Sequence, residues 1–243
     1  MTARSLPDLT TYQAVLFDLD GVLTPTAEVH MHAWQTMFEN LFADWNIAPP
    51  YTEADYFEHL DGKKRYDGVA ALLRNRDVEV PWGDPSDSPE EDTICGIGNR
   101  KNLVFERVLR DEGIAPYPGS LALLDVLAAA GTPIAVVSSS KNAEEVLASA
   151  GIRDRFPVVM DGVIAERDNL SSKPAPDVFV EAARMMGVEP ATSVAVEDAI
   201  SGVRSASAGG FGLVIGVDRG VGASALTDAG AHIVVSDLEE FVQ

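Results

Sequence analysis

Residues 14–24 read AVLFDLDGVLT, a run of four apolar residues followed at once by two carboxylates. A short apolar run that ends in a polar turn is typical of a strand buried on both faces. Asp18 and Asp20 would then lie just beyond the carboxyl end of this strand. Ligands bind at that edge in doubly wound α/β sheets, so this stretch predicts both a fold and the position of a site.

The second half of the chain repeats the strand pattern. Short apolar runs alternate with helical stretches after about residue 113, at 134–137, 158–160, 194–196, 213–217 and 233–235. Helices are expected at 120–130 and 175–186, each followed by a glycine. A last helix is expected after Ser236, because Glu239 would complete a capping box. Such alternation predicts a parallel sheet covered by helices on both faces.

Residues 26–111 interrupt this alternation. They contain no strand-like run, and segments 28–44 and 98–110 place apolar residues three and four positions apart, as amphipathic helices do. We therefore expect an α/β fold: a doubly wound, parallel-sheet (Rossmann-like) core domain from residues 1–25 and 112–243, with a helical cap domain, 26–111, inserted. The Pro-, Asp- and Ser-rich segment 81–92 is expected to be an exposed acidic loop of the cap.

Composition restricts the partners. The chain has 243 residues and a formal net charge of −20, which repels phosphate backbones, so neither nucleic acid nor an anionic membrane is expected as a partner. No apolar run is long enough to cross a bilayer and the N-terminus lacks a signal-peptide core, so a cytoplasmic location is expected. The single cysteine, Cys95, excludes an intramolecular disulfide and is expected to be an incidental thiol in a loop.

Polar groups also follow the later expected strands. Ser138 begins a hydroxyl-rich segment after the second strand, Glu197 and Asp198 follow the fourth, and Lys173 precedes a proline-rich helix start. Each residue alone has an ordinary alternative role in a turn, a helix cap or a helix N-terminus. Together they bring carboxylates, a hydroxyl and an ammonium group to one edge of the sheet, which favours a functional site.

These side chains suit phosphoryl transfer. Asp18 can attack a phosphoryl group to form an aspartyl phosphate, and Asp20 can protonate the leaving oxygen and then activate the next acceptor. Attack by an anion on a phosphate requires charge neutralisation, which Lys173 and Mg²⁺ can supply. Ser138 and the amides near it would hold the transferring oxygens. Mg²⁺ prefers oxygen ligands, so the candidate ligands are Asp18, Asp20, Glu197 and Asp198, with Glu197 either direct or supporting.

The order of these segments resembles that of the haloacid-dehalogenase superfamily. Residues 18–24 (DLDGVLT) resemble its first motif, while Ser138, Lys173 and the pair Glu197-Asp198 resemble the second, third and fourth. The resemblance covers almost the whole chain. Asp20 further indicates a phosphotransferase, because the dehalogenases of the superfamily lack a carboxylate at that position.

Within the superfamily the chain most resembles the β-phosphoglucomutases, which interconvert β-glucose 1-phosphate and glucose 6-phosphate through a bound bisphosphate. This implies a phosphorylated sugar as substrate. It also implies that a cap loop, 61–65 (DGKKR), grips the second phosphate through Arg65, and that Lys101 helps to align the acid–base aspartate. The implied substrate-binding residues are Thr26, His30, Gly62, Lys63, Arg65, Lys101, Ser140, Lys141 and Asn142.

The sequence departs from the mutase pattern at Pro25, at Asp61 and Lys64 in the cap loop, and in the longer segment 81–92. These departures concern the identity of the sugar and leave the core chemistry alone.

Three functional classes follow from these residues. The first is a hexose-phosphate mutase with Asp18 as phosphoryl carrier, and the second is a sugar-phosphate phosphatase of the same fold, in which water takes the phosphoryl group. The third is a non-catalytic regulatory or binding protein on the same scaffold. Arg65 favours the mutase, since a phosphatase needs no cation for a second phosphate. Retention of the four core-motif residues disfavours the third class. We expect a monomer or a weak dimer.

Overall fold

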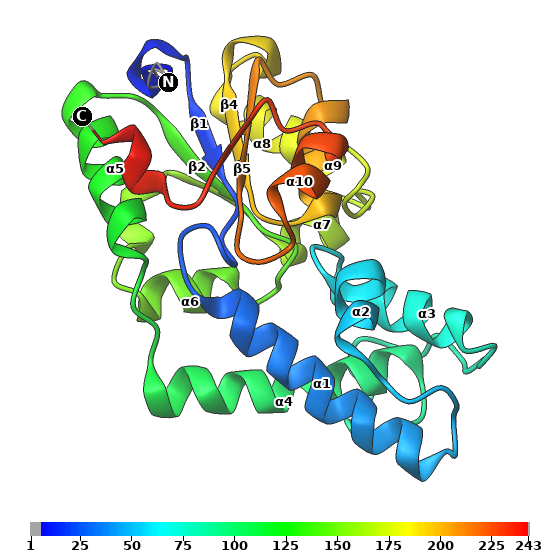
Figure 1. Ribbon diagram of the computed structural model, residues 1–243. Helices are drawn as coiled ribbons and strands as arrows, with labels where there is room; N and C mark the ends of the chain where they lie inside the picture. The colour runs from blue at the N-terminus through cyan, green and yellow to red at the C-terminus, as the bar shows by residue number, and fades with distance from the viewer. Residues whose placement is uncertain (1–5, 243) are drawn as a thin grey trace.

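The computed structural model describes residues 6–242 and has a sheet-containing core above a lobe of helices (Figure 1). Six parallel strands form one sheet in the order β3-β2-β1-β4-β5-β6. Their bounds are β1 Val15–Phe17, β2 Ile134–Val137, β3 Val158–Met160, β4 Val194–Glu197, β5 Leu213–Val217 and β6 Ile233–Val235. The predicted doubly wound α/β fold is confirmed.

Strand β1 lies at the centre of the sheet. It pairs with β2 on one side and β4 on the other, so that Phe17 lies opposite both Val136 and Val196. Successive side chains of β1 point to opposite faces, and each face has its own buried cluster: Val15 and Phe17 belong to one, Leu16 to the other. Burial on both faces explains why this strand is a continuous apolar run.

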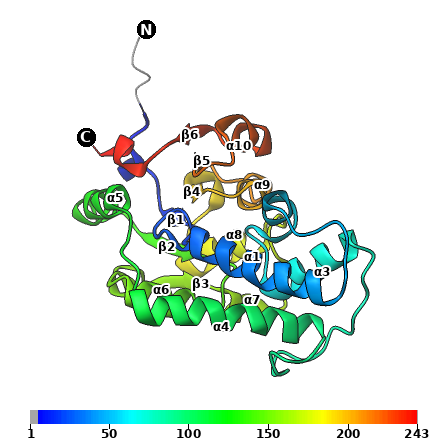
Figure 2. The same ribbon diagram turned by 60° about the horizontal axis from the view of Figure 1, so that its bottom comes forward.

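Helices cover both faces of the sheet, as Figures 1 and 2 show. The cluster that contains Phe17 is completed by α5 (Pro118–Ala130) and α6 (Ala143–Ser149). The opposite cluster is completed by α7 (Gly162–Arg167), α8 (Asp177–Met186), α9 (Ile200–Ala208) and α10 (Ala223–Ala229). This arrangement leaves the carboxyl ends of the strands free to face the helical lobe.

The helical lobe, between β1 and α5, has a hydrophobic core of its own. It contains α1 (Thr26–Asp44), α2 (Glu53–Asp55) with a π-helical turn (Tyr56–Leu60), α3 (Arg65–Asn75) and α4 (Ile94–Glu112). Side chains such as Phe38, Leu72 and Ile97 are buried together within it. The long helices α1 and α4 pack against each other (Figure 2). The proposed domain boundaries themselves stay a prediction.

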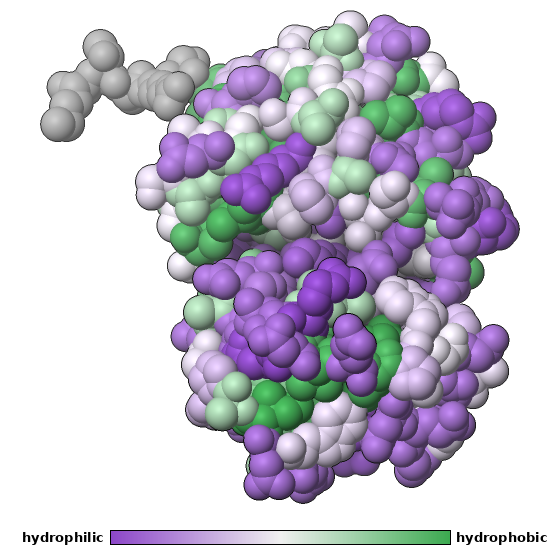
Figure 3. Space-filling view, turned by 90° about the vertical axis from the view of Figure 1, so that its right-hand side faces the viewer, coloured by the Kyte–Doolittle hydropathy of each residue, from purple (hydrophilic) through white to green (hydrophobic). Residues whose placement is uncertain are grey.

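The surface is largely polar, and the acidic loop lies where the sequence predicts it. The face shown in Figure 3 is mainly hydrophilic, with an apolar strip on the lower lobe. Segment 81–92 contains no helix or strand and is mostly exposed, as predicted. Between residues 6 and 242, none of the helices has the length and apolarity that crossing a bilayer demands.

Three local predictions were wrong. Cys95 lies in the first turn of α4 and is fully buried, because its side chain joins the apolar core of the helical lobe. Helix α8 begins at Asp177, since residues 174–176 form a turn that contains two prolines. The last helix is a short 3₁₀ turn, Leu238–Phe241, capped by Asp237 and Glu240 in place of Ser236 and Glu239, because the Asp237 carboxylate accepts from the Glu239 amide at 2.8 Å.

Candidate active site

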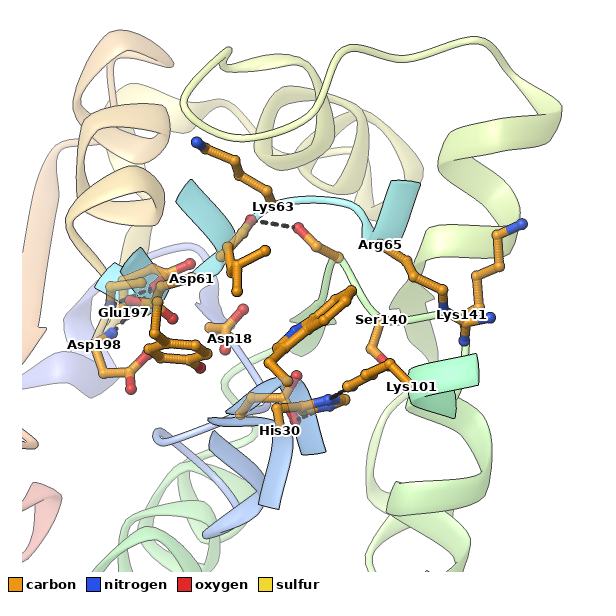
Figure 4. A pocket seen from close by; sticks show the side chains of 17 residues that line it. Asp18, His30, Asp61, Lys63, Arg65, Lys101, Ser140, Lys141, Glu197 and Asp198 are labelled. Atoms are coloured by element: carbon orange, nitrogen blue, oxygen red, sulfur yellow. Dashed lines mark hydrogen bonds and ion pairs between the residues drawn. The ribbon is translucent and has the colours of Figure 1, made fainter. Parts of the chain in front are cut away.

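A pocket lies between the helical lobe and the carboxyl ends of the central strands, and both halves contribute side chains to it (Figure 4). The sequence-predicted residues that line it are Asp18, Asp20, His30, Gly62, Lys63, Arg65, Lys101, Ser140, Lys141, Glu197 and Asp198. Thr26, Ser138, Asn142 and Lys173 are buried around it. The structure therefore brings the predicted site residues together, while their chemical roles stay predictions.

Lys173 forms the buried centre of the site. Its Nζ donates to Asp18 Oδ1 at 2.6 Å, to Glu197 Oε1 at 2.5 Å and to the carbonyl of Val137 at 3.2 Å. Burial lowers the pKa of Lys173, but the two carboxylates outweigh burial and raise it, so the ammonium stays charged. Burial and the Glu197 charge raise the pKa of Asp18 well above its usual range, against the opposing effect of Lys173.

Three carboxylates can approach one cation. Asp18, Glu197 and Asp198 each offer an oxygen, and these oxygens lie within 4.8 Å of one another. The second oxygen of Glu197 accepts from the amides of Asp198 and Ala199, both at 3.1 Å. Glu197 is thus held by Lys173 and the backbone, whereas Asp18 and Asp198 keep oxygens free. A crowded set of hard oxygen donors fits a divalent cation such as Mg²⁺.

Glycine is required where Asp198 approaches the first motif. Gly21 has a φ of +81°, and a Cβ at that position would lie 1.8 Å from Asp198 Oδ2. Any other residue would be strained and would displace the carboxylate. Burial and the charges of Asp61 and Glu197 raise the pKa of Asp198 well above its usual range.

The Asp20 side chain points toward the helical lobe and is outside the group of three carboxylates, although we had predicted it as a fourth ligand. Its Oδ1 accepts from Thr26 and lies 3.4 Å from His30 Nε2, and its Oδ2 lies 3.5 Å from Ser138 Oγ. Burial raises the pKa of Asp20, but His30, Thr26 and Lys101 together outweigh burial and lower it to about 2. Asp20 is therefore ionised at neutral pH.

His30 lies between Lys101 of the helical lobe and Asp20. Lys101 Nζ contacts His30 Nδ1, and His30 Nε2 lies 3.4 Å from Asp20 Oδ1. Burial and the nearby Arg65 charge lower the pKa of Lys101 well below its usual range. The His30 ring stacks on Phe105 with centroids 4.1 Å apart. Burial, followed by the nearby Lys101 charge, lowers the pKa of His30, in agreement with a neutral imidazole.

Arg65 is fixed at the wall of the pocket by side chains of α4. Its Nη2 donates to Asn102 Oδ1 at 2.6 Å and its Nη1 to Asn99 Oδ1 at 3.3 Å. Asn102 Oδ1 also accepts from Asn142 Nδ2 of the core at 2.8 Å. Lys141 pairs with Glu166 at 2.6 Å near the rim. One asparagine oxygen thus connects an arginine of the helical lobe to the loop after β2.

Sequence reasoning missed several residues of this pocket. Ser139 donates to the carbonyl of Gly62 at 2.8 Å, and its place inside the Ser138–Ser140 run was the available signal. Asp61 lines the pocket, although we had noted it only as a departure from the mutase pattern. Tyr56 also lines it, and nothing in the sequence pattern pointed to that residue.

Comparison with known proteins places this site in a family. The model of the haloacid dehalogenase-like hydrolases matches residues 12–210. The chain is 43% identical to the β-phosphoglucomutase of Mycobacterium bovis over 240 residues, which cover 95% of this chain and 91% of that protein. The chain belongs to the haloacid dehalogenase-like hydrolase family.

Further proteins are similar to this chain in sequence or in fold. The β-phosphoglucomutase of Bacillus subtilis is 32% identical over 208 residues, covering 86% of this chain and 84% of that protein. The solved β-phosphoglucomutase of Clostridium difficile shares the fold, with a TM-score of 0.76 at 24% identity, over 94% of this chain and 92% of the other. A mutant of CbbY from Rhodobacter sphaeroides, solved in complex with xylulose-(1,5)bisphosphate, has a TM-score of 0.70 at 27% identity, over 94% and 96%.

The relatives establish the class of reaction. With a family match across most of the chain and β-phosphoglucomutases among its relatives, the protein is a phosphomutase, or a related phosphatase, of this family. The non-catalytic alternative is not favoured by these findings.

Proposed function

We propose that the protein is a Mg²⁺-dependent β-phosphoglucomutase that interconverts β-glucose 1-phosphate and glucose 6-phosphate through an aspartyl phosphate on Asp18. One observation carries this proposal: Asp18, which lines the pocket, contacts the buried ammonium of Lys173, and the fixed guanidinium of Arg65 lines the pocket as well. A substrate that carries two phosphates needs both. CbbY, a relative, was solved with a bisphosphate, which supports the same kind of ligand here.

Asp18 and Asp198 would hold the Mg²⁺, and Glu197 would support them through its contacts with Lys173 and the Asp198 amide. The cation would neutralise charge on the phosphoryl oxygens. Lys173 would orient Asp18, and its charge opposes the rise that burial causes in the pKa of Asp18. The Ser138 hydroxyl, which accepts from the Ser140 amide at 3.0 Å, would contact the transferring group.

Asp20 would move the proton. In one direction, a sugar hydroxyl gives its proton to Asp20 while its oxygen attacks the phosphorus of phosphorylated Asp18, and Asp18 leaves as a carboxylate. In the other direction, protonated Asp20 gives the proton back to the leaving sugar oxygen. Because the pKa of Asp20 is about 2, the residue starts as the base, and the proton it gains is retained only until the next transfer.

We further propose that residues 26–111 act as a cap domain over a core of residues 1–25 and 112–243. Two observations support this division: the helical lobe has its own apolar core, and a pocket lined from both sides lies between it and the sheet edge. An enclosed pocket would exclude water, so that a sugar hydroxyl rather than water takes the phosphoryl group.

The test follows phosphorylated sugars by phosphorus NMR and measures isomerised product and free phosphate together. Arg65→Ala should slow isomerisation by about ten- to over a hundredfold, because a charged bidentate contact is worth about 1.5–3 kcal/mol. Transfer to Asp18 from acetyl phosphate, which has no second phosphate, should change far less. The matched control is Arg74→Ala, an exposed arginine on the same helix.

Equal losses in both reactions for Arg65→Ala would contradict the mutase. So would a wild-type protein that releases phosphate from every sugar phosphate and isomerises none, and that result would indicate a phosphatase.

A further inference from the structure

The loop between the π-helical turn and α3 rests directly on the acidic turn of the core. Ser201 Oγ donates to the carbonyl of Asp61 at 2.9 Å, and Ser139 Oγ donates to the carbonyl of Gly62 at 2.8 Å. A Cβ on Gly62 would lie 2.2 Å from Ser201 Oγ and 3.3 Å from Ala199 Cβ. The cap-loop backbone is therefore in close contact with the turn that follows Glu197 and Asp198.

This contact brings a fourth carboxylate to the cation site. Figure 4 shows Asp61 beside Glu197 and Asp198, and all three line the same pocket. Within residues 6–242, no lysine, arginine or histidine forms an ion pair with Asp61.

When the cap loop contacts the turn after Asp198, the site contains more carboxylates than cations. Lys173 is the one cation that pairs with this acidic group among the described residues, and it already contacts both Asp18 and Glu197. Asp198 and Asp61 are both half-buried and line the same pocket, so placing both there as carboxylates costs electrostatic free energy. Without a further cation, this repulsion disfavours the contact between the cap loop and the core turn. A bound cation favours the contact.

We propose that Asp61 makes closure of the cap depend on the bound cation. This rests on the proposed function only for the position of the Mg²⁺ site. Linkage is reciprocal, so a cation that favours the seated loop must also bind more tightly when the loop is seated. The cap loop thereby closes over the pocket only on a core that already holds its metal.

The experiment titrates Mg²⁺ alone into metal-free protein. Small-angle X-ray scattering reports compaction, and calorimetry reports the affinity for Mg²⁺. Tryptophan fluorescence reports the cap itself, because Trp34, Trp45 and Trp82 all lie in residues 26–111 and Trp34 lines the pocket. The wild type should be expanded without metal and should compact on saturation with Mg²⁺.

Asp61→Asn removes the repulsion and keeps the shape of the side chain. This variant should be compact without metal, should show no further compaction with Mg²⁺, and should bind Mg²⁺ on the order of tenfold more weakly. Asp67→Asn removes the same charge from helix α3 and should behave as the wild type. Ser201→Ala should weaken closure equally with and without Mg²⁺, so the metal dependence should remain.

Two results would overturn the proposal: a wild type that is equally compact with and without Mg²⁺, or an Asp61→Asn variant whose compaction still requires Mg²⁺. If Ser201→Ala alone abolished the metal dependence, the hydrogen bond and not the charge would be the coupling. A wild type that closes on Mg²⁺ but isomerises no sugar phosphate would refute the proposed function and leave this inference intact.

Discussion

Asp18 and Asp20 are two residues apart, yet their surroundings move their pKa values in opposite directions. Burial and Glu197 raise the pKa of Asp18, whereas contacts from His30, Thr26 and Lys101 hold that of Asp20 at about 2 despite burial. Such separation is how one pocket assigns different roles to two identical side chains. A cation beside Asp18 would ionise it as well, and it would then be the nucleophile while Asp20 handles the proton.

At this scale we predict that Asp18→Asn lowers turnover by a factor on the order of 10⁴–10⁶, because no neighbouring group can replace the nucleophile. The fold should persist, since Lys173 still pairs with Glu197. Acetyl phosphate should label wild-type Asp18, as shown by acid trapping and peptide mapping.

The matched variant is Asp20→Asn, which should still accept phosphate from this activated donor while losing turnover of sugar phosphates. Label found on Ser138 or Ser140 would contradict the mechanism.

Among the elements, α4 connects the most functional groups. Lys101 contacts His30, Asn102 holds Arg65 and Asn142, and Phe105 stacks under the imidazole. Residues 101, 102 and 105 fall on adjoining faces of the helix, so one element aligns both the acid–base end and the cation at the opposite wall.

We therefore expect Asn102→Ala to raise KM for the sugar phosphate about tenfold and to change kcat little. It removes the acceptor that fixes Arg65 and leaves the proton-transfer residues in place. Steady-state kinetics checks this split. Asn75→Ala, at the exposed end of α3, is the control. A fall in kcat with unchanged KM would show that Asn102 acts on the acid–base side.

The elements also show how far sequence reasoning extends. The inner strands were predictable because burial on both faces produces an apolar run, as in 134–137 and 213–217. The polar residues after β1 and β4 could be placed at one edge because parallel strands end together. Asp61 and Asn102 could not be assigned, because their positions depend on how the cap rests on the core. Ser236 misled us because the adjacent Asp237 is an equally good cap.

The whole chain has a formal net charge of −20, and several of its carboxylates lie together at the candidate site. Burial and mutual repulsion raise the pKa values of Asp18, Asp61 and Asp198, that of Asp61 to about 7. The folded protein then holds protons that the unfolded chain has already released. Stability from these groups is complete below their unfolded pKa of about 4, and is lost as pH rises through the folded values.

Metal-free protein should therefore become less stable between about pH 5 and pH 8, and Mg²⁺ should remove most of this decline because it favours the ionised carboxylates. Urea unfolding at constant ionic strength, in EDTA or in Mg²⁺, measures the effect. Asp61→Asn should make the metal-free decline shallower. A decline that sodium chloride removes as well as Mg²⁺ would indicate general surface repulsion instead.

The central position of β1 also determines the order in which the molecule can assemble during synthesis. Val15 pairs with Ile134 and Val194, so the strand that precedes Asp18 has no neighbour until more than half of the chain has left the ribosome. At about 5–20 residues per second, that interval lasts roughly ten seconds or more before the second partner appears. The helices of residues 26–111 bury their own core and can pack meanwhile. The helical lobe can thus pack early in synthesis, whereas the candidate site is complete only once Asp198 has been made.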